Sequence, residues 1–178
     1  MPAISQTVDV SARHLVRIAV AVVTLWSSNA MAQRPPSAAL PDTVLFICEH
    51  GTVRSLLAKL LFEEYAKEVG LSMVAVSRGT AIDSAVAPWM MRALTNDGFL
   101  IGSWHPQPLA ASDLAHARHV VSFDLPAAVS ASSRAPREQW DGLPSVSAHY
   151  AAGRDTIAVR VRHLVDSLQL SRAPKRTP

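Results

Sequence analysis

An unbroken apolar run, residues 43–47 (TVLFI), constrains the fold more than any other feature of the chain. Consecutive apolar positions predict a strand that is buried on both faces, as in a parallel sheet covered by helices. Behind the run, apolar side chains recur at helical spacing from Leu56 to Tyr65, and Gly70 follows as a residue typical of helix ends. The segment therefore predicts a strand, a loop and a helix in succession.

The same alternation continues along the chain. Further strands are predicted over residues 72–77 and 119–123, and further helices over residues 86–97, 113–117 and 155–168. Strands that alternate with helices form parallel βαβ units with right-handed crossovers. We therefore predict an α/β fold with a small open parallel sheet flanked by helices. Ligands of such sheets bind beyond the carboxyl ends of the strands, which directs attention to the loop after residue 47.

The first 32 residues have the three parts of a secretory signal peptide. Arg13 and Arg17 precede an apolar run over residues 18–26, and Ala30-Met-Ala32 provides a cleavage site with small residues. A buried N-terminal helix is the alternative; a membrane span would need about 20 apolar residues. Cleavage after Ala32 predicts a periplasmic or secreted protein. No cysteine follows that site, so we expect no stable membrane anchor.

The rest of the chain divides into a proline-rich linker (33–41), one folded domain (42–170) and a basic tail (171–178). A single cysteine cannot form a disulfide within its own chain. The 17 Lys and Arg against 14 Asp and Glu give a formal net charge of +3, without a concentrated basic block. This charge pattern predicts no nucleic-acid partner.

The loop after the first predicted strand has the sequence CEHGTVRS over residues 48–55, called here the Cys48 loop. Five residues between Cys48 and Arg54 allow the loop to curl, so that its backbone N–H groups point at a tetrahedral oxyanion. The following helix N-terminus adds positive potential, and Arg54 offers two parallel donors. The same field favours a thiolate nucleophile at Cys48. The predicted oxyanion-binding residues are Glu49, His50, Gly51, Thr52, Val53 and Ser55.

A buried structural cysteine is the alternative interpretation, because a lone cysteine is most often a small core residue. The placement of Cys48 at a strand end, with five residues between it and an arginine and a helix start next, favours the nucleophile.

With these motifs the chain resembles the low-molecular-weight protein tyrosine phosphatases and the arsenate reductases that share their fold. The resemblance extends over residues 44–168 and rests on VLFIC at 44–48, RS at 54–55, SRGT at 77–80, DG at 97–98, DL at 113–114 and WD at 140–141. It implies a four-stranded parallel sheet in a flavodoxin-like three-layer arrangement. It also implies a cysteinyl-phosphate intermediate that water hydrolyses, with neither cofactor nor metal.

The resemblance also implies a general acid, an Asp before Pro on the loop that precedes the last helix. Here Ser145 holds that position, and Asp141 is either the replacement acid or a solvated turn residue. A general acid typically contributes 10²–10⁴-fold to the rate. His50 and Gly51 occupy positions where the family usually has Gly and Asn, and His50 either adds positive charge or caps the loop.

Three functions remain open from the sequence. The first is an exported phosphatase for phosphomonoesters, aryl phosphates such as phosphotyrosine above all, on a small molecule or a protein. The second is an arsenate reductase that uses an external small thiol, because one cysteine cannot support an internal relay. The third is a catalytically silent protein that binds a phosphate or arsenate oxyanion. Trp104, His105 and Trp140 either form an aromatic wall at the site or pack in the core.

Overall fold

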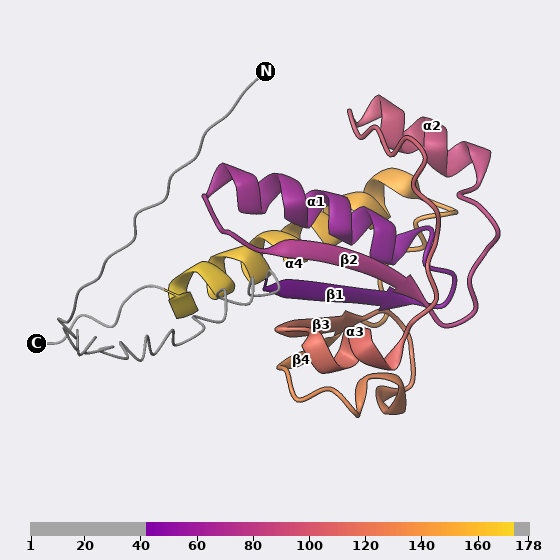
Figure 1. The fold of residues 1–178 in the computed structure, drawn as a ribbon. Helices are drawn as coiled ribbons and strands as arrows, with labels where there is room; N and C mark the ends of the chain where they lie inside the picture. Colours follow the sequence, from indigo (N-terminus) through magenta and orange to yellow (C-terminus); the bar gives the residue numbers. More distant parts are fainter. Residues whose placement is uncertain (1–41, 173–178) are drawn as a thin grey trace, which may run out of the picture. The chain divides into compact units, whose positions relative to one another are not determined.

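The computed structural model describes residues 42–172, so the predicted signal peptide (1–32) and linker (33–41) lie outside the described residues. Figure 1 shows the elements, which follow one another as β1 (Thr43–Cys48), α1 (Arg54–Glu68), β2 (Val74–Gly79), α2 (Pro88–Asn96), α3 (Ala111–His116), β3 (His119–Ser122), the 3₁₀ helix η1 (Ala127–Ser130), β4 (Arg137–Gln139) and α4 (Tyr150–Arg172). Within residues 42–172, no helix has the length and apolar character that crossing a membrane requires.

The four strands form one parallel sheet in the order β2-β1-β3-β4. Strand β1 is central, because Cys48 pairs with Gly79 of β2 while Val44 pairs with His119 of β3. The carboxyl ends of β1, β2 and β3 consequently meet at one edge of the sheet. The predicted α/β fold with a small open parallel sheet is confirmed.

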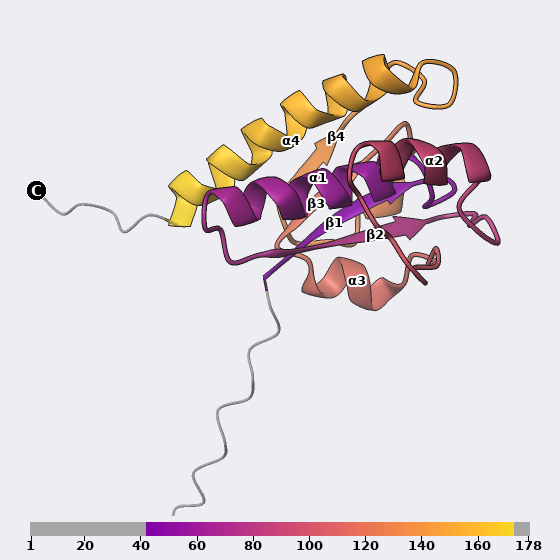
Figure 2. The same cartoon turned by 90° about the horizontal axis from the view of Figure 1, so that it is seen from above.

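Helices cover both faces of the sheet. Helices α1 and α4 pack side by side on one face, and α3 lies on the other (Figures 1 and 2). Successive side chains of a strand point to opposite faces, and β1 follows this rule. Phe46 and Cys48 belong to the larger core cluster under α1 and α4, whereas Leu45 and Ile47 pack in the smaller cluster with Leu114 of α3. The side chain of Cys48 therefore points toward α1, whose N-terminus follows the Cys48 loop.

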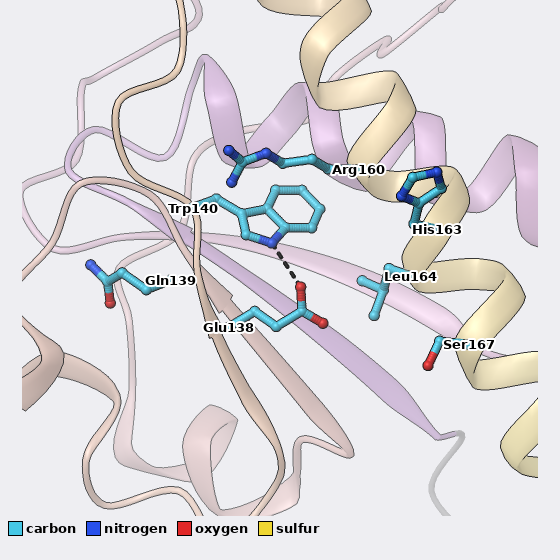
Figure 3. A pocket seen from close by; sticks show the side chains of 7 residues that line it. All are labelled: Glu138, Gln139, Trp140, Arg160, His163, Leu164 and Ser167. Atoms are coloured by element: carbon cyan, nitrogen blue, oxygen red, sulfur yellow. Dashed lines mark hydrogen bonds between the residues drawn. The ribbon is translucent and has the colours of Figure 1, made fainter.

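Trp140 packs in the core and does not form an aromatic wall. Its side chain is 4% exposed, and its ring meets that of Phe123 edge-on with the centroids 5.5 Å apart. The indole Nε1 donates to Glu138 Oε2 at 2.8 Å. Figure 3 shows this bond among the side chains that line a pocket between β4 and α4. A hydrogen bond from His119 is the main cause that lowers the pKa of Glu138.

Several elements differ from the sequence prediction: β2 covers Val74–Gly79 rather than residues 72–77, α3 begins at Ala111 rather than at residue 113, and η1 and β4 were not predicted. Strand β4 has only three residues, too few to produce a periodic pattern. Helix α4 begins at Tyr150 rather than at residue 155, and it continues to Arg172, two residues past the predicted domain end. Tyr150 donates to Asp97 at 2.6 Å, and burial together with this carboxylate raises the pKa of Tyr150. At the other end, Arg172 donates to the carbonyl of Ser72 at 2.9 Å. Tertiary contacts thus extend the helix at both ends.

Candidate active site

The sulfur of Cys48 lies inside the curl of the Cys48 loop. Cys48 is 2% exposed at the end of β1. The backbone N–H of Gly51 donates to its Sγ at 3.2 Å, and the Ser55 hydroxyl lies 3.0 Å from the same atom. One backbone donor and one hydroxyl therefore lie against the sulfur, and a hydroxyl can donate to a thiolate.

A hydrogen-bond chain from the neighbouring strand orients the Ser55 hydroxyl. Ser77 of β2 places its Oγ 2.8 Å from Ser55 Oγ and 3.0 Å from the carbonyl oxygen of Gly51. A hydroxyl carries one proton, so Ser77 donates to one of these acceptors at a time. When Cys48 is a thiolate, Ser55 donates to the sulfur, and Ser77 can donate to Ser55. Ser77 is a site residue that the sequence reasoning did not select, although it lies in β2, the strand beside β1.

The Cys48 loop packs directly against the end of β2 through two glycines. Gly51 has a φ of +74°, a conformation that glycine adopts without steric cost. A Cβ placed on Gly79 would lie 2.9 Å from the Gly51 nitrogen and 2.9 Å from the His50 carbonyl carbon. These are backbone atoms of the loop itself, so a side chain at position 79 must displace the loop.

We expect Gly79→Ala to lower both stability and oxyanion affinity. Forcing a methyl group into this contact should cost about 1–3 kcal/mol in the free energy of unfolding. Urea unfolding gives the stability change, and competitive inhibition by inorganic phosphate gives the affinity. Gly98→Ala is the control, because Gly98 has a φ of +86° with nothing within 4 Å of its added Cβ. That variant should lose stability but keep phosphate affinity; equal phosphate affinity in Gly79→Ala would contradict the close packing.

The carboxylate of Asp124, a residue just after β3, holds the Arg54 side chain at the site. The Nη1 of Arg54 donates to Oδ2 of Asp124. Asp124 has a φ of +47°, and its Oδ1 accepts from the backbone N–H of Gly142 at 2.9 Å. A non-glycine residue in the left-handed region is unusual and often marks a functional site. Asp124 is a second residue missed by the sequence reasoning, although it follows a buried strand at the edge that holds Cys48.

One pocket of about 320 Å³ opens over the sulfur and is called here the Cys48 pocket. It is lined by Cys48, Glu49, His50, Val53, Arg54, Asp124, Leu143, Ser145, Val146 and Ser147. The structure thus brings together both predicted catalytic residues and three of the predicted oxyanion-binding residues. Trp104 and His105, the other candidates for an aromatic wall, are not among the lining residues.

The remaining predicted oxyanion-binding residues, Gly51, Thr52 and Ser55, do not line the Cys48 pocket. Gly51 and Ser55 contact the sulfur, as described above. Thr52 is 1% exposed, and its hydroxyl donates to Oδ2 of Asp83 at 2.6 Å. Asp83 lies in the segment between β2 and α2, so this bond ties the Cys48 loop to a second loop.

Asp141, the predicted replacement acid, is not among the residues that line the Cys48 pocket. Its Oδ1 accepts from the backbone N–H of Asp124 at 3.0 Å and from the Gln139 side chain at 3.1 Å. Both bonds go to Oδ1, and they hold the carboxylate in the turn after β4. Ser145 does line the pocket, and its hydroxyl accepts from the backbone N–H of Ala148 at 3.3 Å. The structure therefore places a hydroxyl, and not a carboxylic acid, on this wall.

Comparison with protein-family models matches residues 43–142 to the low molecular weight phosphotyrosine protein phosphatases. The chain belongs to this family. A comparison with curated protein sequences found no match.

Solved structures of phosphatases and arsenate reductases have the same fold. A thioredoxin-dependent arsenate reductase of Corynebacterium glutamicum is 26% identical, with a TM-score of 0.60 over 76% of this chain and 65% of the reductase. The chain thus spans less than two thirds of that reductase. An arsenate reductase of Archaeoglobus fulgidus is 25% identical, with a TM-score of 0.52 over 69% of this chain and 98% of that one. An arginine phosphatase of Geobacillus stearothermophilus, 18% identical, matches in fold with a TM-score of 0.63 over 78% of this chain and 99% of that one.

Proposed function

We propose that the protein hydrolyses phosphomonoesters through a cysteinyl-phosphate intermediate. The observation that carries this proposal is the placement of the Cys48 sulfur. It accepts a backbone N–H and lies beside a serine hydroxyl in a pocket that Arg54 also lines. An oxyanion in that pocket would meet loop amides and a guanidinium, the arrangement that stabilises charge developing in a transition state.

The reaction has two displacements at phosphorus. The Cys48 thiolate attacks the phosphorus, the S–P bond forms, and the P–O bond breaks with its electron pair leaving on the alcohol or phenol oxygen. That oxygen takes up a proton. Water then attacks the cysteinyl phosphate, which releases inorganic phosphate and restores the thiolate. Arg54 and the loop amides bind the phosphoryl oxygens in both steps.

Aryl phosphates, including phosphotyrosine, are the substrates we favour. Val53, Leu143 and Val146 give the Cys48 pocket an apolar surface for a ring. Ser145 stands in place of a carboxylic acid. Substrates whose leaving group departs without needing a proton should therefore react fastest.

Arsenate reduction is the second candidate, and the relationship to two arsenate reductases favours it. Arsenate has the same tetrahedral shape and charge as phosphate. Reduction to arsenite takes two electrons, which two thiols supply as they become a disulfide. Cys48 is the chain's one cysteine, so a small external thiol must take part.

We propose a periplasmic or secreted location for the mature protein, on the pattern of residues 1–32. N-terminal sequencing of the mature protein from its host tests this proposal. A first residue of Gln33 would support it, and an intact N-terminus at Met1 would contradict it.

Turnover of p-nitrophenyl phosphate and of arsenate tests the proposed function. We expect steady release of p-nitrophenol, because this leaving group needs little protonation. Arsenite formation that depends on added small thiol, without p-nitrophenol release, would favour the reductase. Phosphate binding without either turnover would contradict both enzymes and leave an oxyanion-binding protein.

A further inference from the structure

His50 is one of the residues that line the Cys48 pocket, and its imidazole is a group able to donate a proton. Of its lining residues, those able to carry and release a proton besides Cys48 are Glu49, His50 and Asp124. Asp124 is committed to other partners, because Arg54 and the Gly142 N–H each donate to one of its oxygens. Protonating Asp124 would break its pairing with the arginine that binds the oxyanion. The side chain of Glu49 is 62% exposed, and its Oε2 lies 3.7 Å from Nε2 of the His50 imidazole, beyond hydrogen-bond distance.

The imidazole of His50 is oriented by groups on a second loop. Its Nδ1 lies 3.3 Å from the carbonyl oxygen of Ala81 and 3.4 Å from Oδ1 of Asp83. A carbonyl oxygen can only accept, so Nδ1 carries a proton and Nε2 is the nitrogen that gains or loses one. Asp83 is fixed in turn, because the buried Thr52 hydroxyl donates to its other oxygen at 2.6 Å.

This geometry has the elements of an oriented acid–base catalyst. A carboxylate on one side of an imidazole fixes its tautomer and stabilises the imidazolium, which leaves the other nitrogen for proton transfer. The side chain of His50 is 53% exposed, and the residue lines the Cys48 pocket. The groups that face the ring are Glu49 of the Cys48 loop and Asp83 of the loop after β2; Arg54 and Asp124 line the same pocket.

We propose that His50 is the proton donor to the leaving group, a catalytic role that rests on the proposed phosphatase function. As the Cys48 sulfur attacks phosphorus, the P–O electron pair moves to the leaving oxygen, which takes the Nε2 proton of the His50 imidazolium. His50 is then neutral, with its remaining proton on Nδ1. In the second step its Nε2 removes a proton from the water that attacks the cysteinyl phosphate, so the imidazolium is restored.

The dependence of kcat/KM on the leaving group tests this role. Phenyl phosphate has a poor leaving group that needs a proton, and 2,4-dinitrophenyl phosphate has a good one that does not. We expect His50→Gln to lower the ratio of the two kcat/KM values, phenyl to dinitrophenyl, by about 10²-fold, the low end of a general acid's contribution.

His116→Gln is the matched control. His116 is another exposed histidine whose Nδ1 bonds to a backbone carbonyl, that of Ser112, and it does not line the Cys48 pocket. The ratio should be the same in this variant and in the unmodified protein.

The outcomes separate the two proposals. If His50→Gln lowers both kcat/KM values by the same factor, or neither, His50 only supports the loop and the inference is wrong, while the phosphatase function stands. If the unmodified protein hydrolyses neither substrate, the proposed function itself fails. Should His50→Gln not fold, His50→Asn is the second variant, and an unchanged ratio in that variant would overturn the inference.

Discussion

Replacing Cys48 with serine is expected to reduce turnover of p-nitrophenyl phosphate by about 10⁴-fold or more, as removal of a nucleophile does elsewhere. A serine hydroxyl is almost entirely protonated at neutral pH, so it is a far weaker nucleophile than a thiolate. The site should nevertheless still bind phosphate, because the Gly51 amide and Arg54 remain in place. Steady-state kinetics measures the loss, and phosphate binding by calorimetry measures what is retained.

Retained turnover in Cys48→Ser would show that another group attacks phosphorus. Loss of phosphate binding together with turnover would instead show that the substitution disrupted the Cys48 loop. Ser132→Ala, a substitution in the exposed segment between η1 and β4, is the control for the protein preparation, since this residue lies outside the Cys48 pocket.

Arg54→Lys should cost about 10²–10³-fold in kcat/KM, the loss expected when a principal charge-stabilising donor is removed. Lysine keeps the positive charge but lacks the planar pair of parallel donors that fits two phosphoryl oxygens. It also pairs less well with Asp124, whose carboxylate holds Arg54 at the pocket. The KM for p-nitrophenyl phosphate and the inhibition constant of inorganic phosphate should both rise.

Arg118→Lys is the matched control for this change. Arg118 also pairs with an aspartate, its Nε donating to Asp42 at 2.7 Å, but it is 71% exposed and distant in sequence from the Cys48 loop. Its substitution should leave kcat/KM unchanged. If Arg54→Lys retained full activity, charge alone would account for the arginine and bidentate binding would be excluded.

The strand–loop–helix at the start of the domain was predictable from sequence because local signals agree there. The apolar run of β1 predicted burial on both faces, and the placement of Cys48 between a strand end and a helix start favoured a nucleophile over a buried structural cysteine. Strand β4 was not predictable from its own residues. Its three residues, Arg137, Glu138 and Gln139, are polar, and they form a strand only because β3 offers a free edge.

The support of the site was harder to predict because it depends on pairings between distant segments. Ser77 reaches Ser55 only through the register of β2 against β1, and Asp124 reaches Arg54 only because β3 lies on the other side of β1. Asp141 had the right chemistry for an acid. Its carboxylate instead accepts a hydrogen bond from the backbone N–H of Asp124. The sequence does not reveal this bond, because it joins two separate segments of the chain.

Capture of the covalent intermediate tests the account most directly. The unmodified protein is mixed with p-nitrophenyl phosphate, quenched rapidly, digested with trypsin and analysed by mass spectrometry. The account predicts that the peptide ending at Arg54 gains one phosphoryl group on Cys48, with a burst of p-nitrophenol of matching size. Release of p-nitrophenol with Cys48 unmodified at every quench time, or a phosphoryl group on a different residue, would contradict it.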